Sequence, residues 1–284
     1  MDKNIINIIK NRYFNLSRSQ KRISNYILEN HTKAAFMTAK ALSIEAQVSE
    51  STVVRYANAL GFEGYPELIK ALQENIKSKL TTIQRFDLSN DENLNNNEFS
   101  NKNIMQYDID NIKSTIKQNS KETINLIVDE LSNSNKIYIL GLRSSKVLGS
   151  YLNYYLRLMF NDTFVKEVEV RNIFDDLVNL KKGDILVAIA FPRYSKLTIE
   201  ALKYAKDNNI TVIGLTDGYL SPIREYSKYT LFADLSISTF INSLVAPMSL
   251  INSLVMAISV KNKKTVQYKF EKLEKVWDEY GIFK

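Results

Sequence analysis

The sequence predicts an α plus α/β protein, in which a small all-α domain precedes a parallel sheet sandwiched between helices. Up to about residue 80, apolar residues recur at helical spacing, whereas from residue 136 short apolar runs alternate with longer amphipathic segments. The change falls around residues 89–98, which are rich in asparagine and have no apolar period. We therefore expect a small helical domain at residues 1–80, a linker at 81–105 and an α/β domain at 106–284.

The composition is that of a globular chain. Its 284 residues are 45% hydrophobic and 24% charged, enough for one small and one medium domain. It contains no cysteine, which excludes disulfides and thiolate metal sites. The N-terminus lacks the continuous apolar region of a signal peptide, and the most hydrophobic stretch, residues 243–260, is interrupted by Pro247 and Asn252. We expect a cytoplasmic protein without a membrane span.

The first domain reads as a series of short helices. Ser17 can cap the second of them, and Pro66 suits the first turn of the last. His31, the single histidine, lies near the end of the second helix, where a favourable charge or simple solvation explains it better than catalysis or metal ligation. The predicted helices cover residues 3–10, 18–30, 38–47 and 50–60, with another from residue 65.

Residues 41–60 hold two helical patterns with a tight turn between them. Ser49 stands where an N-cap belongs and can accept from the amide of Ser51 or Thr52, and Gly61 can end the second helix in the left-handed conformation. The inward face of the pair is apolar at helical spacing. Its members are Leu42, Ile44 and Ala46 in the first helix and Val53, Ala57 and Leu60 in the second.

The outward face of residues 50–60 is polar. Hydroxyl, amide and guanidinium groups of this kind reach base edges and phosphates in a major groove, which predicts a helix-turn-helix that reads a double-stranded operator. An ordinary helical hairpin has similar spacing, so this alternative stays open. The residues expected to contact DNA are Ser49, Ser51, Thr52, Arg55 and Asn58, beside Glu50 on the same face.

The charge is unevenly distributed. The whole chain has a formal net charge of +7. Residues 1–80 contain 12 Lys and Arg against 7 Asp and Glu, so +5 lies there and +2 on the remainder. A basic excess on the smaller domain suits binding to phosphates.

From residue 136 the pattern is that of a parallel sheet covered on both faces. Ligands bind such sheets at the carboxyl ends of the strands, near the topological switch point. Strands are expected at residues 137–140, 163–167, 184–190, 210–216 and 229–233, and helices at 104–131, 146–160, 196–208, 222–227 and 239–259.

Two loops at carboxyl ends of these strands, residues 141–146 and 191–195, concentrate hydroxyls and guanidiniums at helix N-termini, where an anion is favoured. Neither loop is a dinucleotide fingerprint. The alternative is that Ser144 and Ser145 only cap the following helix. The residues expected to bind a small anionic effector are Arg143, Ser144, Ser145, Arg193, Tyr194 and Ser195.

Two stretches of the first domain resemble the RpiR family of bacterial transcription regulators. They read LSRSQKRISNYILEN at residues 16–30 and VSESTVVRYANALGFEGYPEL at residues 48–68. Residues 136–235 resemble a sugar isomerase (SIS) domain, the usual C-terminal partner of that helix-turn-helix. TVIGLTD at residues 211–217 and the Ser221-Pro-Ile run carry this second resemblance. The resemblance implies a homodimer or a dimer of dimers, and a phosphosugar as the effector.

The ligand loops depart from the SIS pattern. Ser145 aligns with the serine that ends the first loop of phosphosugar-binding SIS domains, and Ser195 with the threonine of their second loop. Ala190, Pro192 and Arg193 replace serine, serine and glycine of that second loop. Phosphate or carboxylate can still be held, here by bidentate guanidinium contacts.

Three functions therefore remain open. The first is an effector-responsive transcription regulator, and the second is a DNA-binding protein whose SIS domain only dimerises. The third is a sugar-phosphate isomerase, which needs a positioned base. The α/β domain contains no histidine, and its two ligand loops contain no carboxylate. We therefore expect no catalytic residue, metal or cofactor.

Overall fold

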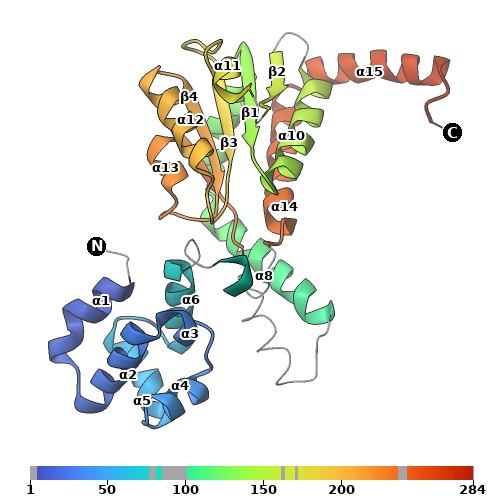
Figure 1. Ribbon diagram of the computed structural model, residues 1–284. Coiled ribbons are helices and arrows are strands. Elements are labelled where there is room, and N and C mark those ends of the chain that lie inside the picture. The colour runs from blue at the N-terminus through green and yellow to red at the C-terminus, as the bar shows by residue number, and fades with distance from the viewer. Residues whose placement is uncertain are drawn as a thin grey trace. The chain divides into compact units, whose positions relative to one another are not determined.

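The computed structural model describes residues 5–76, 81–84, 101–160, 164–169, 172–235 and 242–283 (Figure 1). The chain divides into two compact units, one helical and one α/β. Most of the predicted linker falls outside the described residues.

The helical unit is a bundle of short helices around one apolar core. Ser17 caps α2 through a capping box with Gln20, as the sequence indicates. Its core includes Ile9, Ile23 and Tyr56, each fully buried. The elements are α1 (Ile5–Arg12), a 3-10 helix (Tyr13–Asn15), α2 (Arg18–Glu29), α3 (His31–Ala34), α4 (Ala39–Glu45), α5 (Glu50–Ala59) and α6 (Tyr65–Ile76).

The prediction that Ile44 faces inward is wrong. Leu42 and Ala46 are buried, but Ile44 is 67% exposed. With 3.6 residues per turn, Ile44 lies about 200° around α4 from Leu42, on the opposite side of this short helix. His31 begins the four-residue helix α3 rather than lying in the last turn of α2.

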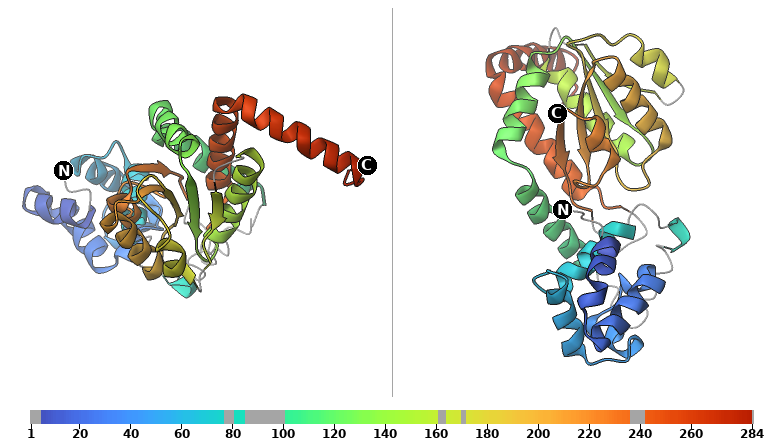
Figure 2. Two further views of the ribbon diagram at one scale, coloured as in Figure 1. Left: turned by 90° about the horizontal axis from the view of Figure 1, so that it is seen from above. Right: turned by 90° about the vertical axis from the view of Figure 1, so that its left-hand side faces the viewer.

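The α/β unit contains one sheet of five parallel strands in the order β2-β1-β3-β4-β5. Figure 2 shows helices on both of its faces. The elements are α8 (Asn101–Gln118), α9 (Lys121–Ser132), β1 (Lys136–Gly141), α10 (Ser145–Met159), β2 (Phe164–Glu167), α11 (Ile173–Leu177), β3 (Ile185–Ile189), α12 (Lys196–Asp207), β4 (Thr211–Thr216), α13 (Pro222–Tyr226), β5 (Tyr229–Phe232), α14 (Val245–Lys261) and α15 (Lys263–Glu279).

Alternate residues of each strand face the two layers of helices. In β1, Ile137 and Ile139 join a core built with α9, α10 and α14. Tyr138 and Leu140 join a second core built with α11, α12 and α13. The two cores bury both faces of the sheet, which explains why the strands read as continuous apolar runs.

The expected helix at residues 104–131 is two helices. The break falls at Asn119 and Ser120, where Ser120 caps α9 by accepting from the amide of Thr123 at 3.1 Å. The Asn119 side chain accepts from the Phe232 amide and donates to the Phe232 carbonyl at the edge of the sheet. These contacts with β5 replace the helical continuation at the turn.

The C-terminal region also differs from the expectation. The helix predicted at residues 239–259 begins only at Val245, and residues 236–241 lie outside the described residues. After Asn262 the chain bends by 98° into α15, which the sequence reading did not predict. Within the described residues no single helix has the length and apolar character of a membrane span, although α14 and α15 taken together pass by length and composition.

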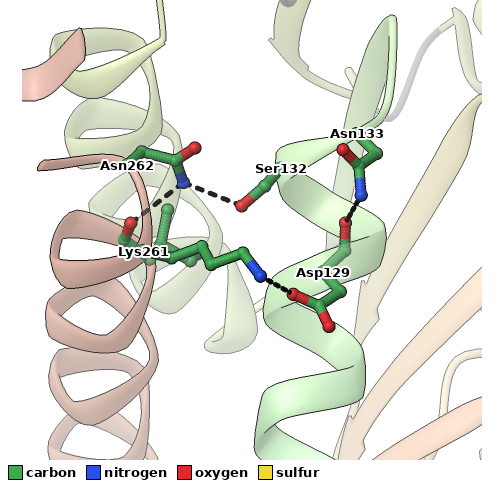
Figure 3. Close-up of polar contacts among 6 residues, drawn as sticks. Asp129, Ser132, Asn133, Lys261 and Asn262 are labelled. Carbon is green, nitrogen blue, oxygen red and sulfur yellow. Dashed lines mark hydrogen bonds and ion pairs between the residues drawn. The ribbon is translucent and has the colours of Figure 1, made fainter. Parts of the chain in front are cut away.

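The corner between α14 and α15 is fixed against α9 (Figure 3). The Asn262 side chain donates to the Ser132 hydroxyl at 2.7 Å and to the Ile258 carbonyl at 3.0 Å. Lys261 pairs with Asp129 at 2.7 Å. The polar contacts hold the end of α14 on α9 and direct the chain away from the sheet.

Candidate nucleic-acid interface and anion site

The second helix of the helix-turn-helix, α5, begins and ends as its sequence indicates. The Ser49 hydroxyl accepts from the Thr52 amide at 3.3 Å. Gly61 has a φ of +86° after the last turn. The expected inward residues Val53, Ala57 and Leu60 are all buried. The cap and the apolar face together fix which side of α5 remains outside.

The outer side of α5 carries the polar set expected to contact DNA. Ser51, Arg55 and Asn58 are exposed, and Thr52 is half-buried. Hydroxyl contacts run from Ser49 to Ser51 at 3.0 Å and to Thr52 at 2.8 Å. The Arg55 guanidinium donates to the Thr52 hydroxyl at 3.5 Å, a long contact that DNA can replace.

Two arginines that the sequence reading did not single out hold α5 in place. Arg22 of α2 donates to the carbonyl of Gln47 at 3.1 Å and to its side chain at 2.8 Å, and Gln47 forms the turn with a φ of +52°. Arg12 donates to the Ala59 carbonyl, in the last turn of α5, at 2.8 Å. Part of the basic excess of this unit therefore positions α5, since these guanidiniums already have carbonyl partners.

A buried hydrogen bond attaches the middle of α5 to α2. The Tyr56 and Ser24 hydroxyls lie 2.9 Å apart and both residues are fully buried. Burial raises the pKa of the Tyr56 phenol well above its usual value, so it stays neutral. The contact fixes the rotation of α5 and hence the direction of its polar face.

In the α/β unit, the topological switch point lies between β1 and β3. These strands are neighbours, with Gly141 in register with Ile189 at their carboxyl ends. The helix after β1, α10, packs in one core, and the helix after β3, α12, packs in the other. The two predicted ligand loops thus follow adjacent strands at the point where parallel sheets bind ligands.

The arginine of each loop has left-handed backbone geometry. Arg143 has a φ of +57° and Arg193 a φ of +70°, and both side chains are exposed. This conformation is unfavourable for a residue with a Cβ and clusters at functional sites. Gly141 is required by close packing, because a Cβ there would lie 2.5 Å from the Ser145 carbonyl oxygen.

The serines of the loops do not cap the helices that follow. Ser144 and Ser195 occupy the N-cap positions of α10 and α12, and neither side chain makes a capping hydrogen bond. The alternative that Ser144 and Ser145 serve only as caps is therefore not supported. Ser145 is buried in the first turn of α10, whereas Ser144 is exposed and Ser195 half-buried.

The first-turn amides of α10 are already engaged. The amides of Ser145, Lys146 and Val147 donate to carbonyls three residues earlier, at 3.1 to 3.3 Å. An anion at this end therefore meets the positive end of the helix and nearby side chains more than vacant amides.

Tyr194 is committed to the loop after β4. Its hydroxyl donates to the Asp217 carboxylate, which also accepts from Thr216 at 3.1 Å. Thr216 is in turn 2.7 Å from the Ser221 hydroxyl. Burial, reinforced by the charge of Asp217, raises the pKa of Tyr194, so the phenol remains a donor. Tyr194 thus ties the second loop to β4 and leaves its ring, rather than its hydroxyl, for a ligand.

Asp217 is a carboxylate that the sequence analysis did not place near the predicted ligand loops. The two predicted ligand loops contain no carboxylate, but the neighbouring loop brings one into contact with Tyr194. The signal was the position of Asp217 directly after the apolar run of β4. Among the described residues, no group of three His, Asp or Glu side chains is placed to hold a metal ion.

A cavity of about 600 Å³ lies elsewhere, along the β5 edge of the sheet. Its lining comes from the α8–α9 turn, α13 and β5, and includes Ser120, Tyr219, Arg224 and Lys228. Lys228 pairs with Glu130, and the Arg224 guanidinium lies over the Tyr219 ring. The loops of Arg143 and Arg193 do not line it.

A helix-turn-helix unit followed by a parallel α/β unit is typical of DNA-binding regulators, whose second domain is of a type that binds small ligands. Known proteins agree: residues 3–79 match the helix-turn-helix domain of the rpiR family, and residues 130–257 match the SIS domain. Together the two matches cover most of the chain. The protein belongs to the RpiR family of helix-turn-helix transcriptional regulators with a C-terminal SIS domain.

Individual relatives are distant but extend along both units. An uncharacterised helix-turn-helix regulator of Clostridium perfringens is 26% identical over 229 residues, 80% of each chain. The regulator HexR of Escherichia coli is 23% identical over 223 residues, 78% of this chain and 75% of its own. The structure of Vibrio vulnificus NanR complexed with ManNAc-6P covers 96% of this chain and 99% of its own, with 23% identity and a TM-score of 0.55.

Proposed function

We propose that this protein is an effector-responsive transcription regulator: α5 reads a double-stranded operator, and the loops that follow β1 and β3 bind a small anionic metabolite, a sugar phosphate or related carbohydrate derivative. The metabolite changes operator affinity. The observation that carries the proposal is that one chain contains both a capped α5 with a polar outer face and two arginine loops that follow adjacent central strands.

The electrostatics of the loops support an anionic ligand. Arg143 and Arg193 follow neighbouring strands, at the positive ends of α10 and α12. Left-handed backbone at both arginines costs folding free energy, which a binding role would explain. The hydroxyls of Ser144 and Ser195 are not used as caps and can donate to an anion, with Ser145 beside them.

The structural relative NanR, which was solved with ManNAc-6P, favours a phosphosugar over other anions. The second loop here carries Pro192 and Arg193 where phosphosugar-binding SIS domains have serine and glycine. We infer that guanidinium contacts replace part of the usual hydroxyl and backbone cradle.

The remaining features of the proposal concern organisation. We propose domains at residues 1–80 and 106–284 with a linker at 81–105, a cytoplasmic location, and a homodimer or dimer of dimers that presents two copies of α5 to a pseudo-palindromic site. Two alternatives are an SIS domain that only dimerises and a sugar-phosphate isomerase. The regulator names of the relatives argue against the enzyme, and the Asp217 carboxylate beside the second loop already accepts from the Tyr194 hydroxyl.

Thermal denaturation of the full chain with sugar phosphates, sugar acids and inorganic phosphate tests the effector proposal. A ligand that binds the folded state alone at 100 times its Kd adds about 2.7 kcal/mol of stability, which is readily measured as a higher Tm. We expect one sugar phosphate to stabilise the wild type and to leave Arg143→Ala unaffected. If none of these anions stabilises the wild type, the loops of Arg143 and Arg193 do not bind this class of ligand.

A further inference from the structure

The helix α15 carries an apolar stripe that its own unit does not cover. All of α15 is described, and Val266 alone of its residues is buried. Beyond it Phe270, Leu273 and Trp277 continue the stripe at spacings of three and four residues, followed by Tyr280, which is 71% exposed. Exposed apolar surface arranged in this way marks an interaction site.

The base of α15 is fixed, so the stripe cannot fold back on its own sheet. Lys269 donates to the carbonyls of Phe160 at 2.6 Å and Arg157 at 3.1 Å, at the end of α10. Asn262 and Lys261 hold the preceding corner on α9 (Figure 3). Figures 1 and 2 show the helix leaving the α/β unit beyond this point.

The end of the chain adds to the same surface. The Ile282 amide donates to the Trp277 carbonyl at 2.9 Å, and the chain turns at Gly281, which has a φ of +60°. The Phe283 ring thereby lies edge-on to Trp277 at a centroid distance of 5.2 Å. An aromatic pair thus sits at the tip of α15, with Phe283 67% exposed.

The charges of α15 indicate its partner. Residues 263–270 contain three lysines and no acidic residue, whereas residues 271–279 contain four acidic residues and two lysines. Two copies of this helix side by side in antiparallel orientation bring each basic half against an acidic half, and a parallel arrangement opposes like charges. A surface that is complementary to itself under a two-fold rotation is what a symmetric dimer requires.

We propose that α15 is the pairing surface of the homodimer: the α15 helices of two copies pack antiparallel, burying Phe270, Leu273 and Trp277. The inference rests on the homodimer of the proposed function and assigns its surface. The preceding apolar helix, α14, is a weaker candidate, because it directs most of its apolar residues into the core and exposes chiefly Val245, Met256 and Val260.

Sedimentation velocity of the full chain at micromolar concentration tests this assignment. We expect a wild-type dimer, and a dimer Kd raised about tenfold or more in Leu273→Glu/Trp277→Glu, as for loss of central apolar contacts. Met256→Glu is the control, since it places a glutamate on an exposed apolar position of α14. It should leave the Kd unchanged. Circular dichroism checks that each variant is folded.

A second pair of variants tests the orientation. Lys263→Glu/Lys264→Glu and Asp278→Lys/Glu279→Lys should each weaken self-association, and an equimolar mixture should restore it as a heterodimer. A wild-type dimer that the α15 apolar variant does not weaken, or that Met256→Glu weakens equally, overturns the α15 assignment and leaves the dimer of the proposed function intact. A wild-type monomer in the presence of operator DNA overturns both.

Discussion

At the residue scale, the proposed anion-binding residues Arg143 and Arg193 stand where backbone strain lowers stability. Each has a positive φ, although glycine would take this conformation without strain. Each stands in a loop at the carboxyl end of a central strand, beside a serine that does not cap its helix. A strained, charged side chain at both places agrees with the binding role that we propose for these loops.

Arg143→Gly is therefore expected to stabilise the fold and to remove the effector response. Removing the strain of the left-handed backbone should raise the free energy of unfolding by ~1–2 kcal/mol. The greater freedom of glycine in the unfolded chain should lower it by ~0.4–1 kcal/mol. The net increase should be about 0.5–1 kcal/mol. Urea denaturation measures this difference. Arg143→Ala keeps the Cβ and should change stability little. A less stable Arg143→Gly protein would mean that the side chain supports the loop structurally.

At the scale of single elements, α5 is held by side-chain contacts at its start, its centre and its end. Its start is capped by Ser49, the preceding turn is held by Arg22, its last turn accepts from Arg12, and its centre is bonded to Ser24. These contacts fix the helix axis and its rotation before DNA is met. Pre-organisation of this kind lowers the entropy lost on binding.

Arg55→Ala should weaken binding to a selected operator by ~1–3 kcal/mol if the guanidinium reads a guanine, and the loss should be smaller for unrelated duplexes. Within the described part of the chain, the only side-chain hydrogen bond of Arg55 is the long one to Thr52, so the substitution should leave stability nearly unchanged. Fluorescence anisotropy with operator and scrambled duplexes measures both affinities. Equal losses on the two duplexes would make Arg55 a phosphate contact, and unchanged binding by Arg55→Ala and Ser51→Ala would remove α5 as the reader.

Local signals predicted α5, and distant contacts explain what the sequence could not predict. Ser49 and Gly61 mark the ends of α5 within a few residues, and the period of its apolar face identifies the outer side. The break after α8, in contrast, is secured by Asn119 bonding to Phe232, 113 residues away. Asp217 meets Tyr194 only because β3 and β4 are neighbours, which no local pattern states.

In the α/β unit, too, local patterns predicted some features and distant contacts determine others. The parallel strands and the loops of Arg143 and Arg193 follow from apolar runs and the switch-point rule. Tertiary anchors at Asn262 and Lys269 define where α15 begins and how it leaves the domain. A local signal for α15 was present in its apolar residues at spacings of three and four, and the sequence analysis did not use it.

At the scale of the whole molecule, regulation requires that the effector bind the operator-bound and free conformations with different affinities. The change in operator affinity cannot exceed that difference, and linkage makes it reciprocal, so DNA must alter effector affinity by the same factor. In a symmetric dimer the effector can act by changing the distance between the two α5 helices, because that distance sets the fit to the two half-sites.

Operator binding with and without effector tests the central claim most directly. A duplex selected from a random pool by the full chain is titrated by anisotropy in the presence of each sugar phosphate, for the wild type and for Arg193→Ala. We expect the selected duplex to be two-fold symmetric and one sugar phosphate to shift the apparent Kd of the wild type about 5–150-fold. Arg193→Ala should show no such shift, and its binding without effector should stay near wild type. A wild-type affinity that no anion changes, or an Arg193→Ala protein that responds as strongly as the wild type, would contradict it.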